Sequence, residues 1–161
     1  MKRIGQYVPT VAKYIILLLT AGYVALLMLF ISGSRKPFDE VSSAVREAVG
    51  TETLTEQTGQ ALKRSYGLNS SDYDGVLYFT SASSISAEEV LLVRVKDSSQ
   101  IQQVTDAIEE HTQNRLGDFE GYAPEQVKIL EDARQSVRGN YIFFAVSENA
   151  DQYIEAFADS L

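Results

Sequence analysis

The sequence predicts an α+β protein in which a transmembrane helix precedes a two-layer domain, a small antiparallel sheet packed against helices. Residues 14–32 contain no charged side chain, and the later segments change between helical and strand periodicity. Hydrophobic periodicity is the main sequence signal for secondary structure. Two predicted strands are also adjacent in the sequence, which favours an antiparallel hairpin. Helices around such a hairpin predict layered packing.

The chain has 161 residues, 45% of them hydrophobic, which suffices for one globular core and an accessory segment. We therefore predict four parts. They are a cytoplasmic segment at 1–13, a transmembrane signal-anchor helix at 14–32, a linker at 33–37 and an extracytoplasmic domain at 38–161.

The stretch YIILLLTAGYVALLMLFIS at 14–32 would extend roughly 28 Å as a helix, close to the thickness of a bilayer's hydrocarbon core. A buried helix of a soluble protein is the alternative, but such a helix seldom lacks a polar stripe for so long. We therefore expect residues 14–32 to contact the lipid bilayer.

The small residues Ser32-Gly33-Ser34 would suit signal peptidase. However, the apolar run is longer than the roughly 7 to 15 residues of a cleaved signal, which favours an uncleaved anchor. The basic residues near each end favour a cytoplasmic N-terminus only mildly. Lys2, Arg3 and Lys13 precede the stretch, and Arg35, Lys36 and Arg46 follow it.

Charge excludes several partners. All 22 acidic residues lie at or beyond Asp39 together with 9 of the 14 basic residues, which gives that region a formal charge of −13. Phosphate recognition needs clustered Lys and Arg, so we expect no nucleic-acid partner and no docking on an anionic lipid surface. The chain has no Cys, which excludes disulfides, thiol catalysis and a lipid-modified cysteine.

Two helices are predicted to open the domain. The first follows Pro37 and ends at Gly50, with Phe38 and three valines on one face. The second begins at a capping box formed by Thr53 and Glu56 and ends at Gly67.

Alternating apolar residues then predict strands at 76–80 and 91–95, joined by the polar loop SASSIS. A long helix follows from Ser99, and its apolar positions recur every three or four residues up to Leu116. Gly117 and Gly121 are predicted to bracket a loop.

Pro124 fits the first position of the next helix, since the first N–H of a helix needs no partner. The stretch SVRGNYIFFAVS predicts a strand with a turn or bulge at Gly139-Asn140. Asn149 is predicted to cap a final amphipathic helix, whose apolar stripe comprises Tyr153, Ile154, Phe157, Ala158 and Leu161. The predicted order of the domain is therefore ααββααβα.

No catalytic or metal-ligating set is predicted, and no cofactor. Residues 69–75, NSSDYDG, resemble half a calcium loop, but Ser70 and Ser81 occupy the positions that need carboxylates, which favours a turn. His111 is the only His and lacks a nucleophile motif, so we interpret it as a helix-boundary residue. Acidic pairs such as Glu88-Glu89 are interpreted as solvated charge, because neighbours on a helix point apart.

The segment GDFEGYAPEQ at 117–126 contains Tyr122, which has two interpretations, one structural and one functional. Tyr122 is expected to pack its ring on the following helix while its hydroxyl binds the backbone. The alternative is a polar surface patch that contacts a protein or a glycan. It would contain Tyr122, Glu125, Arg138 and Asn140.

GYAPEQVKILEDA and VRGNYIFFAVSE, followed by an amphipathic helix, resemble the family catalogued as domain of unknown function 4358, found in Gram-positive bacteria. The resemblance covers roughly residues 38–161. Its marks are Tyr122, Pro124, Glu125, Gln126, Gly139, Asn140 and Tyr141. The resemblance implies an exported domain tethered by lipid or a membrane helix, without an established activity. This chain has no lipobox Cys, which leaves the helix as its tether.

From these observations we expect a non-catalytic, single-pass membrane-anchored module outside the cytoplasm that binds or scaffolds a protein or cell-wall partner in the envelope. One alternative is an envelope enzyme that acts on cell-wall polymer through carboxylates and Tyr122. Another is a sensor of a small ligand or cation.

Overall fold

The computed structural model describes residues 8–31, 36–50 and 52–161. The chain divides into two compact units, Met1–Gly33 and Ser34–Leu161. The segment Ser32-Gly33-Ser34, whose small residues would suit signal peptidase, lies outside the described residues. In the first unit, α1 spans Val8–Ile31, and its side chains are described at 13–24, where all are exposed.

Among the residues that the structure describes, no helix is both long enough and apolar enough to cross a membrane.

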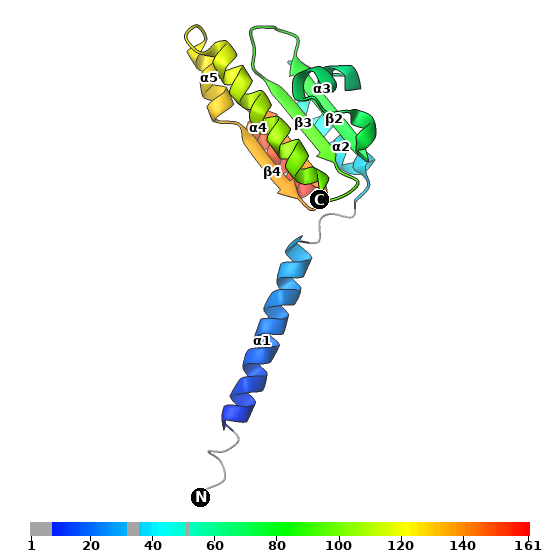
Figure 1. The fold of residues 1–161 in the computed structure, drawn as a ribbon, viewed down its shortest axis with the longest axis vertical. Coiled ribbons are helices and arrows are strands. Elements are labelled where there is room, and N and C mark those ends of the chain that lie inside the picture. Colours follow the sequence, from blue (N-terminus) through cyan, green and yellow to red (C-terminus); the bar gives the residue numbers. More distant parts are fainter. Residues whose placement is uncertain (1–7, 32–35, 51) are drawn as a thin grey trace, which may run out of the picture. The chain divides into compact units, whose positions relative to one another are not determined.

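The second unit contains a five-stranded antiparallel sheet in the order β1-β2-β3-β5-β4 (Figure 1). The strands are β1 (Leu54–Glu56), β2 (Gly75–Ser81), β3 (Glu89–Arg94), β4 (Arg134–Arg138) and β5 (Tyr141–Val146). The helices are α2 (Phe38–Val49), α3 (Gly59–Tyr66), α4 (Gln100–Phe119), α5 (Pro124–Glu131) and α6 (Ala150–Asp159), with a 3₁₀ turn, η1, at Ser70–Asp72. The predicted α+β class and the 75–94 hairpin are confirmed.

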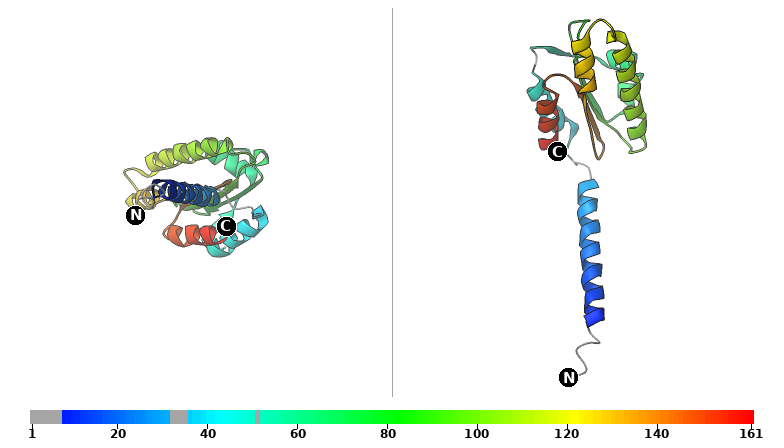
Figure 2. Two further views of the ribbon diagram at one scale, coloured as in Figure 1. Left: turned by 90° about the horizontal axis from the view of Figure 1, so that it is seen from below. Right: turned by 90° about the vertical axis from the view of Figure 1, so that its left-hand side faces the viewer.

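Helices cover both faces of this sheet, so the domain has three layers and the predicted two-layer packing is wrong (Figure 2). Leu91 and Val93 of β3 pack with α3, α4 and α5, whereas Val90 and Leu92 pack with α2 and α6. Strands buried on both faces read as continuous apolar runs. The run YIFFAV in β5, buried at every position, is such a run.

The predicted second helix begins too early. Residues 54–56 form the edge strand β1, in which Glu56 pairs with Phe79 of β2, so the predicted capping box at Thr53 is wrong. An Arg46–Glu56 ion pair, with the NH2 nitrogen 3.0 Å from Oε1, connects this strand to α2. The helix that follows ends at Gly67 as predicted, with a left-handed φ of 69°.

Three further predictions need correction. Gly139 and Asn140 form the two-residue turn of a β4–β5 hairpin, with Gly139 at φ 57°, so two strands replace the one predicted. Gly117 lies inside α4, and the loop begins only after Phe119. The Asn149 side chain caps no backbone group of α6, and Ala158 in the predicted stripe is exposed.

Gly75 at the start of β2 offers a stability test. A Cβ placed there would overlap the ring of Phe38, which α2 packs against the sheet, whereas a Cβ at Gly117 meets nothing within 4 Å. We expect Gly75→Ala to lower the free energy of unfolding by about 1 to 3 kcal/mol, because overpacking displaces the ring. Gly117→Ala should raise it by about 0.5 to 1 kcal/mol, since Ala favours a helix interior. Urea denaturation of both variants measures the difference, and equal effects would contradict it.

Candidate functional site

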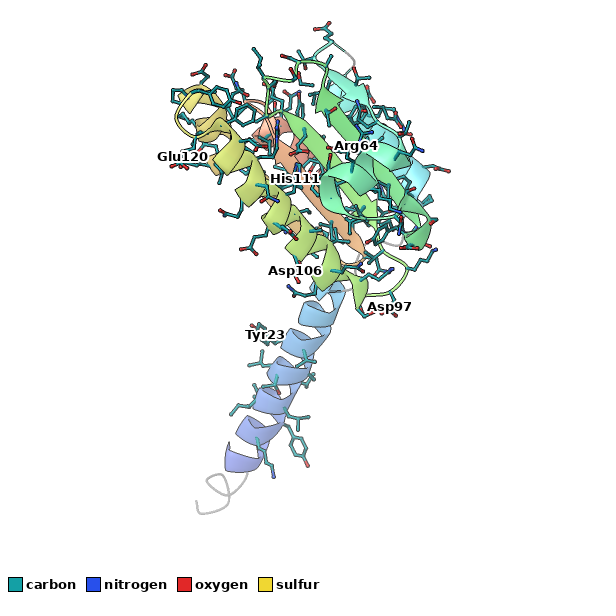
Figure 3. The ribbon with its side chains drawn as sticks, turned by 45° about the horizontal axis from the view of Figure 1, so that its top comes forward. Tyr23, Arg64, Asp97, Asp106, His111 and Glu120 are labelled. Atoms are coloured by element: carbon teal, nitrogen blue, oxygen red, sulfur yellow. The ribbon has the colours of Figure 1, made fainter. Side chains whose placement is uncertain are left out.

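A buried polar cluster joins the sheet to the helices on one face. Glu89 of β3 accepts hydrogen bonds through Oε2 from the hydroxyls of Tyr66 (2.8 Å) and Tyr78 (3.1 Å). Its Oε1 lies 2.8 Å from Nε2 of His111, in the middle of α4 (Figure 3). The Glu89 side chain is 5% exposed and that of His111 11%. We call Ser65, Tyr66, Tyr78, Glu89 and His111 the Glu89–His111 cluster.

The hydrogen-bond partners of His111 show how many protons His111 and Glu89 carry between them. Nδ1 of His111 lies 3.0 Å from the backbone oxygen of Ser65, and because a carbonyl only accepts, Nδ1 carries a proton. A second proton must then lie between Nε2 and Oε1 of Glu89, since two acceptors cannot face each other at 2.8 Å. The pair as a whole is therefore neutral, which lowers the cost of burying a carboxylate.

Burial of the two tyrosines changes their acidity. Loss of hydration raises the pKa of Tyr66 well above its ordinary value, and the neighbouring Glu89 charge raises it further. The same two causes, in the same order, raise the pKa of Tyr78. Both hydroxyls therefore remain protonated donors in the folded domain while the unfolded chain would ionise.

This difference predicts alkaline destabilisation. Above a pH of about 10 the tyrosines ionise in the unfolded chain but not in the fold, so the unfolded state binds fewer protons and stability falls as pH rises. Below that pH the contribution is fully present. We expect the double variant Tyr66→Phe/Tyr78→Phe to show a shallower decline in melting temperature between pH 9 and 11. An unchanged slope would contradict this account.

A cavity of about 320 Å³ opens above the cluster. Tyr78, Glu89 and His111 line it, together with Arg115 of α4. Much of its wall is formed by Ser81 at the end of β2 and by three serines of the β2–β3 loop, at positions 83, 84 and 86. We call this cavity the serine pocket. Its volume falls at the lower end of the range for small-molecule sites.

Arg115 is held in place at the wall of the serine pocket. Its guanidinium lies over the Phe119 ring, 4.6 Å from the centroid, and the NH2 nitrogen donates to the backbone oxygen of Ser86 at 2.9 Å. Asp118 is 3.9 Å from the NH1 nitrogen and exposed, so water screens that ion pair. A guanidinium has five N–H donors, and this geometry leaves some available to a ligand.

The serine pocket lies at one end of the sheet. Glu89 pairs with Val146 there, whereas Gly75, Arg94 and Tyr141 form the opposite end. The Tyr141 hydroxyl donates to the backbone oxygen of Lys36 (2.9 Å), so the domain begins at that opposite end. We call the two ends the pocket end and the Lys36 end.

The structure separates the four predicted binding residues. Arg138 ends β4 and Asn140 belongs to the β4–β5 turn, both at the Lys36 end, where the Val95 amide donates to the Asn140 carbonyl, beside the start of α4. Tyr122 and Glu125 follow the other end of α4, whose 20 residues span roughly 30 Å (Figures 1 and 3). The four residues therefore form no single patch.

Tyr122 differs from its predicted packing. It is 64% exposed, and its ring centroid lies 5.8 Å from that of Phe119 in the preceding helix α4. Among the described residues its hydroxyl has no hydrogen-bond partner. Pro124 begins α5 as predicted, and Gln126 two residues later accepts from the Ala87 amide at 2.7 Å. This bond connects α5 to the β2–β3 loop at the pocket end.

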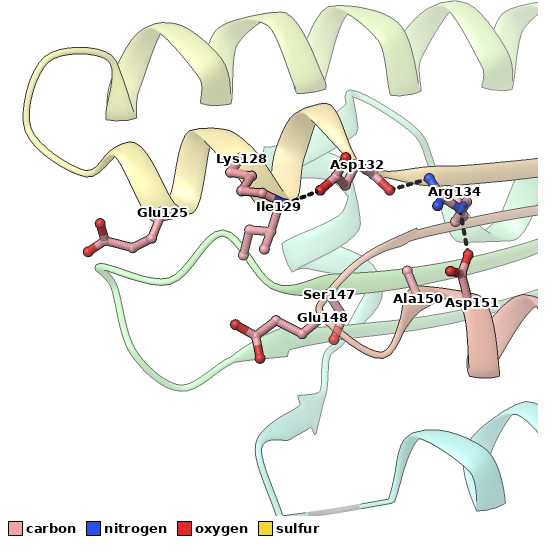
Figure 4. A pocket seen from close by; sticks show the side chains of 9 residues that line it. All are labelled: Glu125, Lys128, Ile129, Asp132, Arg134, Ser147, Glu148, Ala150 and Asp151. Carbon is pink, nitrogen blue, oxygen red and sulfur yellow. Dashed lines mark hydrogen bonds and ion pairs between the residues drawn. The ribbon is translucent and has the colours of Figure 1, made fainter.

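Glu125 lines a second, larger cavity of about 490 Å³ beside α5, β4 and α6 (Figure 4). Its charged groups mostly pair with one another. Lys128 contacts Asp132 (2.7 Å), and Arg134 contacts Asp151 (2.6 Å). These pairs are exposed and worth little. The lining includes one buried polar residue, Ser147, whereas the buried Glu89–His111 pair lines the serine pocket. The serine pocket is therefore the stronger candidate site.

Within residues 69–75, Ser70–Asp72 form the short turn η1 and Gly75 begins β2, as the turn interpretation predicted. Lys96 donates to the backbone oxygen of Ser71 (2.8 Å), and Gln100 donates to that of Asp72 (3.0 Å). Both bonds attach this turn to the residues around the start of α4. Within the described part of the chain, no three His, Asp or Glu residues gather as metal ligands.

The model of the family described as "Domain of unknown function (DUF4358)" matches residues 47–147. The chain belongs to this family. Searches of curated proteins and of solved structures found no match. The DUF4358 match is narrower than the predicted 38–161 and takes in all five strands with α3, α4 and α5. It therefore includes the whole Glu89–His111 cluster and Arg115.

This site in the DUF4358 region was not predicted from the sequence, although its two central residues follow the periodicity of buried positions. Glu89 lies two and four residues before Leu91 and Val93 in the same strand. Because side chains alternate between the two faces of a strand, Glu89 lies on the same buried face as these two residues. His111 follows Val104 and Ile108 by seven and three residues, on the apolar face of α4. The interpretation of Glu89 as solvated charge is therefore wrong, because it lies on a buried strand face.

Proposed function

We propose that this DUF4358 protein is a single-pass membrane-anchored module. Its domain at 38–161 would lie outside the cytoplasm and bind or scaffold a component of the cell envelope without catalysing a reaction. The serine pocket is the binding site that this proposal favours. The observation that carries the proposal is the uncharged apolar stretch at 14–32 that precedes an acidic domain.

The side chains of α1 support a lipid environment. Ile15, Leu18 and Leu19 are among its exposed apolar residues, and exposing such a side chain to water costs roughly 1.5 to 3 kcal/mol. Thr20 donates its hydroxyl to backbone oxygens one turn earlier, of Ile16 and Leu17, both at 3.0 Å. Its polar hydrogen is thus satisfied within the helix, as hydrocarbon surroundings require.

Charge supports the proposed orientation. Lys2, Arg3 and Lys13 precede the stretch with no acidic residue, and positive residues favour the cytoplasmic side. The region from Asp39 onward carries a formal charge of −13. Anionic lipids of the cytoplasmic leaflet would repel such a domain.

The geometry of the cluster favours binding over catalysis. Both ring nitrogens of His111 are occupied, one by a backbone carbonyl and one by Glu89. A general base needs a free lone pair within reach of the proton that it removes. Oε2 of Glu89 already accepts two hydroxyls, so this carboxylate holds the fold together instead.

Fractionation of cells that express the full chain tests the anchor. We expect the chain in the membrane pellet, resistant to alkaline carbonate and released by detergent. Deletion of residues 14–32 should move the protein to the soluble fraction. A full-length chain that is freely soluble after gentle, detergent-free lysis would refute the proposal.

A further inference from the structure

The serine pocket is electrically balanced. Arg115 contributes one positive charge and Glu88 one negative charge, while Glu89 and His111 share a proton and sum to zero. A phosphate would meet one guanidinium but also the Glu88 carboxylate, and a metal cation would meet Arg115. Charge balance therefore favours a ligand without net charge.

The wall of the pocket offers hydroxyl groups in excess. Ser81 and Ser86 accept backbone amides through Oγ, from Ser83 and Glu88 respectively, both at 3.2 Å. Their hydroxyl protons have no acceptor among the described residues, and the Ser83 and Ser84 hydroxyls have no partner there either. Each such hydroxyl can both donate and accept. A ligand that is itself rich in hydroxyls complements this wall.

The remaining polar groups limit the ligand further. Arg115 presents fixed N–H donors, and Glu88 accepts from Ser147 (3.0 Å) through Oε1 only, which leaves Oε2 as an acceptor. The rigid cluster below forms a floor that is already satisfied and need not rearrange. An apolar ligand would strip water from these groups without replacing their hydrogen bonds.

We propose that the serine pocket binds a neutral saccharide of one or two sugar rings. The volume of about 320 Å³ sets this size. The inference rests on the proposed function, because it names the ligand class of the envelope-binding module. The pocket end is also the end of the domain opposite Lys36, whose carbonyl accepts the Tyr141 hydroxyl.

Calorimetric titration of the full chain tests the inference, in a detergent without a sugar headgroup such as lauryldimethylamine oxide. The probes are glucose, N-acetylglucosamine and the β-1,4-linked dimer of N-acetylglucosamine. We expect saturable binding of at least one probe, with no competition from inorganic phosphate. Ser83→Ala/Ser84→Ala should weaken it about tenfold, since two hydrogen bonds are lost.

Ser98→Ala/Ser99→Ala is the matched control. These two serines are adjacent and exposed like Ser83 and Ser84, but they lie at the start of α4, toward the Lys36 end. We expect this variant to bind as the parent does, and thermal unfolding should be unchanged in both variants. Absence of binding by all three probes, equal loss in both variants, or competition by phosphate would overturn the inference.

The proposal of a membrane anchor and the proposal of a saccharide ligand can be refuted independently of each other. A membrane-bound chain that ignores all three saccharides would overturn the ligand class and leave the anchor standing. A soluble chain that binds a saccharide through Ser83 and Ser84 would overturn the anchor alone.

Discussion

Replacing His111 by Leu is expected to lower the free energy of unfolding by about 3 to 5 kcal/mol, because it leaves the Glu89 carboxylate buried without its proton-sharing partner. The carbonyl of Ser65 loses its donor in the same variant. Urea denaturation of the full chain, followed by its tyrosine signal, measures the loss. The chain has nine Tyr and no Trp.

A double-mutant cycle separates the pair from its surroundings. Glu89→Leu/His111→Leu should lose less than the sum of the two single losses, with a coupling energy of at least about 1 kcal/mol. Glu110→Ala, on the exposed side of the same helix, should change stability by no more than about 0.5 kcal/mol. Additive single losses would show that Glu89 and His111 do not interact as described.

Phe157→Ala is expected to lower the free energy of unfolding by about 3 to 5 kcal/mol, the usual cost of removing a buried phenylalanine ring. Phe157 of α6 is fully buried, and its ring stacks on Phe143 of β5 at 5.0 Å with an interplanar angle of 11°. This contact attaches the second helical layer to the sheet.

Glu155→Ala is the control for this variant, since Glu155 lies on the exposed side of α6 and should matter little. A loss below about 1 kcal/mol for Phe157→Ala would mean that α6 does not close this face. The packing of α6 against this face of the sheet would then be wrong.

Local signals were enough to predict much of the fold. The β2–β3 hairpin follows from alternation around a short polar loop, and α5 begins at Pro124 because proline suits a first helical position. The end of α3 at Gly67 could be predicted because a residue that ends a helix often adopts the left-handed conformation, which glycine adopts without strain.

The features that sequence did not predict depend on contacts between distant residues. The strand β1 has three residues and exists because it pairs with β2, about 25 positions later, so local propensity could not reveal it. The second helical layer could be predicted only if both faces of β3 and β5 were recognised as buried.

The candidate site depends on the same kind of contact. Ser65 and His111 are 46 positions apart, and Glu89 joins them from a third element. The sequence shows each of these residues, but it does not show that the fold brings the three into contact. Of the four residues predicted to bind, the fold places Tyr122 and Glu125 toward the pocket end, and Arg138 and Asn140 at the Lys36 end.

The most direct test of the anchored, outward-facing module is cysteine labelling in intact cells, which is unambiguous because the chain has no native Cys. Ser84→Cys places a thiol on the exposed β2–β3 loop, and Gln6→Cys places one before the apolar stretch. A membrane-impermeant maleimide should label Ser84→Cys in intact cells and Gln6→Cys only after permeabilisation. Labelling of Gln6→Cys but not Ser84→Cys in intact cells would contradict the account.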